Sequence, residues 1–139
     1  MGSSEGAARL RVPLRPGPDD IDALGHVNNA VHVRWLQEAG TAHWLALATA
    51  EEQARLVWVV VRHEIDYLKP CHMGEALVAE TWADNPRGAR FDRLVRILGA
   101  RDGDVRAQAR TTWVLMDRER MRPLRIPAEM ARRFLARPA

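Results

Sequence analysis

Residues 39–50, Ala-Gly-Thr-Ala-His-Trp-Leu-Ala-Leu-Ala-Thr-Ala, decide the fold that the sequence predicts. Placed on a helix, this stretch is apolar or small on every side, and its polar interruptions are Thr41, His43 and Thr49. Asn28 is a favourable N-cap residue, so we predict a helix from Asn28 to about Ala50. A helix that is apolar all round is expected to be buried. The remainder of the chain must therefore wrap around it.

The residues after this helix change their hydrophobic period. From Leu56 onward the alternation is that of strands, which we predict at 56–68, 76–83, 91–98 and from Val105 onward. Asn85-Pro86-Arg87-Gly88 and Asp102-Gly103 are typical turn sequences between them. Because such short connections join antiparallel neighbours, the sequence predicts a curved antiparallel sheet around the helix.

The two ends of the chain add shorter elements. Leu10–Leu14 alternates like a first strand, and its proline favours an edge of the sheet. Pro127 suits the first turn of a final helix, Ala128–Leu135. Residues 1–8 are small and polar, and we expect them to be disordered. Residues 9–139 are expected to form a single α+β domain. In the strand from Val105, one face is expected to be packed (Val105, Ala107, Ala109, Thr111, Trp113) and the other solvated (Arg106, Gln108, Arg110).

Composition narrows the class of protein. The chain has 139 residues, 28% of them charged, and a net charge of +3, which suits one globular domain. A single cysteine, Cys71, excludes an internal disulfide. No apolar run reaches the roughly 18 residues of a membrane span, and no secretory signal is visible, so we expect a cytoplasmic protein without a membrane partner.

Arginine is the dominant basic residue. Of 21 lysines and arginines, all but Lys69 are arginine, whose planar fork suits phosphate groups. Compositional bias of the encoding genome is the preferred explanation of the excess. The arginines have no interleaved aromatic residues, so we expect no nucleic-acid partner.

Several reactive side chains lie directly before the helix, in Asp20-Ile21-Asp22-Ala23-Leu24-Gly25-His26-Val27-Asn28-Asn29. A helix N-terminus presents unpaired N–H groups and a partial positive charge, which can stabilise a developing oxyanion. A carboxylate held nearby could attack a carbonyl or deprotonate a water molecule that does. The same residue types also serve as ordinary helix caps, with Gly25 merely permitting a tight turn.

This segment resembles the signature of the 4-hydroxybenzoyl-CoA thioesterase-like branch of the hotdog superfamily, which also contains acyl-ACP thioesterases. The resemblance extends to Val59–Pro70, to Gly74 and to Trp113–Asp117. It implies a hotdog fold, hydrolysis of an acyl-CoA or acyl-carrier-protein thioester, and a homodimer or homotetramer with sites between subunits. Coenzyme A would enter as part of the substrate, and no other cofactor is implied.

Residue by residue, the resemblance implies a catalytic role for Asp22, with a carbonyl-polarising N–H around Asn28 and Asn29. His26 matches a histidine implicated in some branches, so it is a further catalytic candidate, against the alternative that it orders the loop or the thioester. Gly25 and Asn28 are candidates for binding the substrate. Asp20 is interpreted as structural. As candidates for the CoA phosphates we name Arg87, Arg90 and the arginines of residues 118–137, against the alternative of a solvated basic tail.

The sequence also departs from the family. His32 stands where a tyrosine is usual, and Leu24 stands where plant acyl-ACP members have asparagine, so the acyl specificity does not follow from the motif. Glu38 lies on the helix that carries a catalytic glutamate in other branches, although a buried, paired structural carboxylate is the alternative.

Other functions are weighed against this one. Cys71 and His72 are adjacent in a strand-like segment and so would point to opposite faces, which argues against a Cys–His pair. No spacing indicates a metal site. A hotdog dehydratase and a non-catalytic acyl-CoA-binding domain stay open as alternative functions.

Overall fold

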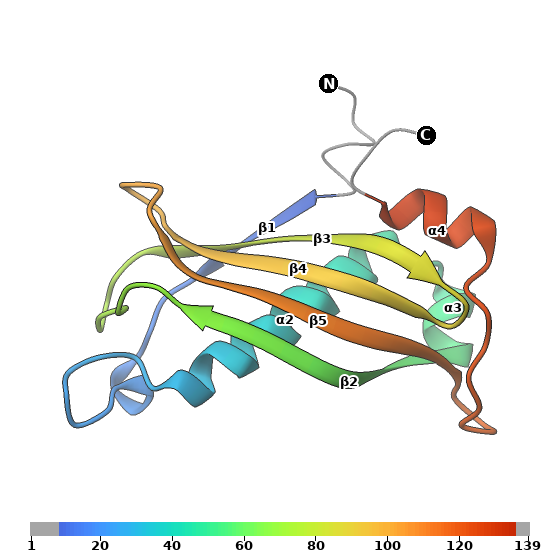
Figure 1. Cartoon of the computed structure of the whole chain (residues 1–139), viewed down its shortest axis with the longest axis horizontal. Helices are drawn as coiled ribbons and strands as arrows, with labels where there is room; N and C mark the ends of the chain where they lie inside the picture. The colour runs from blue at the N-terminus through green and yellow to red at the C-terminus, as the bar shows by residue number, and fades with distance from the viewer. Residues whose placement is uncertain (1–8, 136–139) are drawn as a thin grey trace.

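A computed structural model describes residues 9–135. The elements follow in the order β1 (Arg9–Leu14), η1 (Pro18–Asp20), α2 (Asn29–Leu47), α3 (Ala50–Arg55), β2 (Leu56–Tyr67), β3 (Leu77–Arg87), β4 (Arg90–Gly99), β5 (Val105–Asp117) and α4 (Ala128–Phe134). The five strands form one antiparallel sheet in the order β1-β3-β4-β5-β2. Figure 1 shows the curved sheet with α2 lying along one of its faces. The predicted α+β class is thus confirmed.

The residues at which the helix begins and ends have identifiable causes. Asn28 is the N-cap, and its side chain accepts a hydrogen bond from the Ala30 N–H. The helix ends at Leu47, slightly before the predicted Ala50, because Thr49 caps a new helix instead. Thr49 and Glu52 form a reciprocal capping box there. That Thr-x-x-Glu pattern was readable in the sequence, but the prediction did not include α3.

The prediction that the later half of the helix, from Ala39 onward, is buried on every side is wrong for the single chain. The core of this layer lies between α2 and the sheet, where Trp35, Leu36 and Ala39 pack against strand residues such as Leu77 and Ile97. Helix α2 packs against β1, β3 and β4. Its opposite side is open, and Leu45 there is 55% exposed. The apolar pattern therefore exceeds what the subunit's own sheet covers.

The strands agree with the predictions except at two places. Strand β3 runs through Asn85 and Pro86 to Arg87, where a turn was predicted, because the register shifts after Asp84 and the turn moves to Gly88. Arg106 was predicted to be solvated, yet it is buried because Glu75 and Asp102 both pair with it. The predicted edge position of β1 and the packed face of β5 are confirmed.

The C-terminal helix closes the far end of the sheet. Pro127 is the N-cap of α4, one position before the predicted first turn. Met130 and Phe134 of α4 pack with Phe91 and Leu115 in a second apolar cluster. Within residues 9–135, no helix is both long and apolar enough to cross a membrane. The predicted disorder of residues 1–8 falls outside the described part of the chain.

Candidate active site at the start of helix α2

The loop between β1 and α2 folds back on itself around Asp22. The Asp22 N–H donates to the His26 carbonyl (2.8 Å), and the Gly25 N–H donates to the Asp22 carbonyl (3.1 Å). Gly25 has a φ of 80°, in the left-handed region that glycine adopts without steric cost. An antiparallel bridge between Ile21 and Val27 closes the loop. These contacts hold Asp22 at a fixed place just ahead of the helix.

The half-buried Asp22 carboxylate is fixed through one of its oxygens. Oδ1 accepts hydrogen bonds from the Leu24 N–H (2.9 Å) and the His26 N–H (3.2 Å). For Oδ2 the described residues offer no hydrogen-bond donor. The side chain is therefore oriented by its own loop and keeps one oxygen available for chemistry.

The helix start leaves one N–H group available. The Asn28 N–H donates to the Asp20 carbonyl (2.8 Å), and the Ala30 N–H donates to Asn28 Oδ1 (3.0 Å). The Asn29 N–H has no acceptor within residues 9–135, and Asn29 is exposed. The sequence predicted a carbonyl-polarising N–H donor around Asn28 and Asn29. Because the Asn28 N–H is already bonded, Asn29 is the candidate donor. An N–H at this position, supported by the helix dipole, can polarise a carbonyl oxygen.

Asp20 is occupied by structural contacts, as interpreted from the sequence. Its carboxylate accepts from the Gly17 N–H (2.9 Å) and from Arg34 (3.1 Å). The Gly17 hydrogen bond, and then Arg34, hold the pKa of Asp20 below its usual value. Glu38 lies 3.4 Å from the same Arg34 and is exposed, so it is paired but not buried. Neither carboxylate shares the geometry of Asp22.

The segment after β2 supports the loop from the side. The Val27 N–H donates to the Cys71 carbonyl (2.8 Å), and His26 forms a β-bridge with His72. The two imidazole rings meet edge to face with centroids 5.3 Å apart. Among the described residues, no group of three or more His, Cys, Asp or Glu side chains is placed to hold a metal ion.

Sequence reasoning missed the partner of Cys71. The thiol is fully buried, and its Sγ lies 3.9 Å from Nε2 of the buried His32 on α2. Burial raises the pKa of the Cys71 thiol to about 11, and burial lowers the pKa of His32. Both groups are therefore neutral near pH 7, which argues against a thiolate nucleophile. The prediction that Cys71 and His72 do not pair is consistent with this arrangement.

His32 also connects the helix to β2. Its ring lies 5.1 Å from that of Tyr67, whose hydroxyl donates to the Asn29 carbonyl (3.2 Å). Tyr67 thus reaches the first turn of α2 from the end of β2. His32, which stands at the position where a tyrosine is usual in the family, therefore makes an aromatic contact with Tyr67. The residue type at position 32 gave no indication of this contact with Tyr67.

Arg87 and Arg90 do not lie near Asp22 of the same chain. The start of β3, at Leu77, pairs with Leu14 beside the Asp22 loop, whereas Arg87 ends that strand. At about 3.3 Å per residue, the separation is roughly 30 Å. Figure 1 shows the β3–β4 turn at the opposite end of the molecule from the start of α2. Arg87 is instead paired with the buried Asp92 (3.1 Å).

Other basic residues lie at the same end as the loop. Arg15 and Arg101 line a cavity of about 270 Å³, together with Glu75 and Arg106. The Gly74 N–H in its wall donates to the Pro16 carbonyl (3.2 Å), which ties this cavity to the loop that leads to Asp22. Arg106 is neutralised by Glu75 and Asp102, so Arg15 and Arg101 supply the available positive charge.

An antiparallel sheet curved around a helix is the architecture of the hotdog fold (Figure 1). The sequence comparison agrees: residues 16–134 match the thioesterase-like superfamily, and the chain belongs to that family. The resemblance to the 4-hydroxybenzoyl-CoA thioesterase-like family is confirmed, and the general activity is hydrolysis of acyl-CoA thioesters. No curated protein sequence matches the chain.

Three solved structures illustrate the likeness. A thioesterase from Thermus thermophilus, complexed with coenzyme A and zinc, is 25% identical, with a TM-score of 0.76 over 89% of this chain and 90% of that one. A probable thioesterase from Escherichia coli is 24% identical, with a TM-score of 0.73 over 90% and 94%. A 1,4-dihydroxy-2-naphthoyl-CoA thioesterase from Synechocystis is 19% identical, with a TM-score of 0.75 over 91% and 95%. The last two likenesses concern the fold.

Proposed function

We propose that the chain hydrolyses an acyl-CoA thioester with Asp22 as the catalytic carboxylate and the Asn29 N–H as the donor to the thioester carbonyl. Asp22 either attacks the carbonyl carbon, giving a mixed anhydride and CoA thiolate, or removes a proton from the attacking water. On the first route water then hydrolyses the anhydride and regenerates the Asp22 carboxylate, so that by either route the acyl group leaves as the free acid and the CoA thiolate is protonated to the free thiol. No cofactor is needed beyond the CoA of the substrate.

The observation that carries this proposal is the difference in hydrogen bonding between the two carboxylate oxygens of Asp22. Two backbone N–H groups orient Oδ1, while Oδ2 stays available. A carboxylate that served only as a loop cap would need no free oxygen, and the helix that this loop leads into begins with the unused N–H of Asn29. Asp20, seated two residues earlier, has both oxygens engaged and so offers a matched comparison.

Asp22→Asn is a sharp test because the amide oxygen can still accept the bonds from Leu24 and His26. We expect the fold and thermal stability to be retained and thiol release from acyl-CoA to fall by at least about a hundredfold. Asp20→Asn is the control, with an expected loss of less than about tenfold. Turnover of Asp22→Asn close to that of the wild type would contradict the proposal.

The same assay separates the alternative functions. A panel of short, long and aromatic acyl-CoAs would be followed by release of free thiol. If the wild type binds these compounds tightly and releases thiol from none, the chain is a binding domain and the catalytic proposal fails.

We infer further that Arg15 and Arg101 contact the phosphates of CoA, in place of Arg87 and Arg90 of the same subunit. The support is their position at the end of the molecule that carries Asp22. Arg101→Ala should raise KM for acyl-CoA about tenfold and leave the KM of an N-acetylcysteamine thioester, which lacks phosphates, unchanged. Arg90→Ala is the control. Equal effects on both substrates would contradict this assignment.

We also propose a homodimer formed through β2, or a homotetramer of two such dimers. Strand β2 is a sheet edge of 12 residues with β5 as its one neighbour, and Val61 on it is 49% exposed. A long apolar edge is a template for pairing with another chain. Light scattering coupled to gel filtration measures this state directly. A species of 15.7 kDa with full turnover would contradict the proposal.

A further inference from the structure

Arg93 on β4 is a buried cation at the end of the molecule that carries α4. It is 3% exposed, and a Cβ built at Gly40 would lie 3.2 Å from its Nε. Gly40 itself lies about 18 Å along α2 from Asn28, at 1.5 Å per residue. Arg93 is therefore remote from the Asp22 loop, and neither the proposed catalysis nor the proposed contacts with CoA involve it.

The positive charge of Arg93 is not balanced by a carboxylate. Its Nη1 donates to His43 Nδ1 (2.9 Å) and to Thr81 Oγ1 (3.1 Å), and a ring nitrogen or hydroxyl that accepts a hydrogen bond brings no negative charge. No carboxylate of the described residues lies within ion-pair distance of the guanidinium. Burial lowers the pKa of Arg93 to about 9, so the side chain still carries its charge near pH 7. The Phe91 ring, 5.2 Å from Arg93 Cζ, compensates this buried charge only in part.

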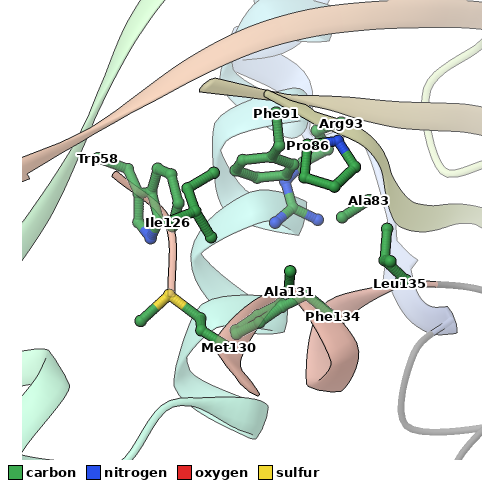
Figure 2. Close-up of a pocket in the computed structure, with 10 residues that line it drawn as sticks. All are labelled: Trp58, Ala83, Pro86, Phe91, Arg93, Ile126, Met130, Ala131, Phe134 and Leu135. Carbon is green, nitrogen blue, oxygen red and sulfur yellow. The ribbon is translucent and has the colours of Figure 1, made fainter. Parts of the chain in front are cut away.

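The two remaining nitrogens of the guanidinium differ in their surroundings. Nε is sealed against Gly40, where no ligand can enter. Nη2 has no acceptor within residues 9–135 either, but it keeps some accessible surface, and Arg93 lines a cavity under α4. Figure 2 shows the guanidinium pointing into the space between Phe91 of β4 and Ala131 of α4. A donor of a buried cation is thus directed into a cavity, and such a donor calls for an acceptor.

The size and the walls of this cavity limit what the acceptor can be. The cavity measures about 20 Å³, which is room for about one water molecule. A carboxylate or a phosphate has at least three heavy atoms and needs more space. No acidic residue of the described chain lines the cavity, and the side chains around Arg93 are apolar or aromatic, among them Met130 and Phe134. The acceptor must therefore be a single atom or a water molecule.

We propose that the cavity between Arg93 and α4 binds a monatomic anion, with chloride as the occupant. The ion accepts a hydrogen bond from Arg93 Nη2 and contacts the apolar walls around it. A water molecule would satisfy the same donor, but it would leave the buried charge uncompensated, whereas a halide ion does both. The bound ion connects β4 to α4 and takes no part in the thioester chemistry. This proposal therefore does not depend on the proposed function.

Chloride binding to the full chain is measured by chlorine NMR, in which exchange with a protein site broadens the resonance of the free ion. We expect a saturable broadening that bromide displaces. Gluconate, an anion too large for the cavity, should leave it unchanged at the same sodium concentration. Absence of saturable broadening would mean that water alone occupies the cavity and would overturn the proposal. Equal displacement by bromide and gluconate would also overturn it, because exposed arginines do not select anions by size.

Two pairs of variants test the position of the ion. Ala131→Val adds two methyl groups opposite the guanidinium and should reduce the saturable broadening at least about fivefold, whereas Ala128→Val, at an exposed position of α4 outside the cavity, should not. Arg93→Met should abolish the broadening, and Arg120→Met, which removes an exposed arginine, is its control. Arg93→Met also deprives His43 and Thr81 of their donor, so Ala131→Val decides the outcome if that variant does not fold. Full broadening in Ala131→Val would refute the site.

A crystal grown in bromide locates the ion directly through its anomalous scattering. We expect a peak in contact with Arg93 Nη2, between Phe91 and Ala131. Peaks at exposed arginines and none at Arg93 would indicate an adventitious ion only and would refute the proposal. Asp22→Asn should bind chloride as the wild type does, so failure of the catalytic proposal and failure of this one are distinguishable.

Discussion

Replacing Asn28 with alanine removes the hydrogen bond that caps α2, from the Ala30 N–H to Asn28 Oδ1 at 3.0 Å. Loss of an N-cap side chain costs about 1 kcal/mol, within a range of about 0.5–2. Asn28 is exposed and its remaining bonds are made by its backbone, so no cavity adds to this cost. We therefore expect the free energy of unfolding in urea to fall by about 1 kcal/mol. Thr49→Ala, which removes the cap of α3, should cost about the same.

Asn28→Asp separates the cap from the proposed chemistry. Aspartate retains the capping oxygen and its charge interacts favourably with the helix dipole, so stability should be unchanged or slightly higher. The same charge lies next to the Asn29 N–H, where an oxyanion would develop, and repulsion should lower kcat by about tenfold or more. Wild-type kcat in Asn28→Asp would refute Asn29 as the oxyanion donor. Unchanged stability of Asn28→Ala would refute the capping argument.

Two further substitutions test the surroundings of the site. Gly25→Ala should lower the free energy of unfolding by about 1–2 kcal/mol, because alanine at a φ of 80° is strained although no neighbour lies within 4 Å of the new Cβ. Gly17→Ala, at a negative φ, should cost far less in the same urea titration. Equal losses of stability in the two variants would contradict the strain argument. Burial lowers the pKa of His32 below its ordinary 6.5, so the unfolded chain binds a proton at this imidazole more readily than the folded chain does. The contribution of the neutral His32 to the free energy of unfolding is therefore fully present above pH 6.5 and decreases as the pH falls below it. His32→Phe should reduce the loss of stability between about pH 7.5 and about pH 5.5 by up to about 1.4 kcal/mol per pH unit, whereas an unchanged pH profile would contradict this reasoning.

Much of the fold was predictable because it depends on local rules. The N-cap preference of Asn28 and the alternation within β5 each point to one local structure, and the structure agrees with both. The end of β3 was not predictable in this way. Asn85 and Pro86 are turn-formers by residue type, yet pairing with β4 and a left-handed φ of 54° at Asn85 carry the strand onward to Arg87.

The candidate site was predictable where it is contiguous in sequence and not where distant segments meet. Asp22, Gly25 and Asn29 lie close together in the sequence, in the loop before α2 and at the first position of the helix, so local structure alone sets their arrangement. Arg87 and Arg90 were chosen for their charge alone, and strand order places them at the other end of the sheet. The contact between His32 and Cys71 joins residues 39 apart in the chain, and no local pattern could have indicated it.

The hydrogen bond from the Val27 N–H to the Cys71 carbonyl has a consequence for how the molecule folds. It closes a chain loop that contains all of α2, α3 and β2, and such distant closures form late because their entropy must be offset by structure already in place. The Asp22 loop can thus acquire its shape only after β2 has joined the sheet. In hydrogen exchange, the Val27 amide would report the opening of this closure separately from the unfolding of α2. Formation of the Asp22 loop thus depends on completion of the sheet.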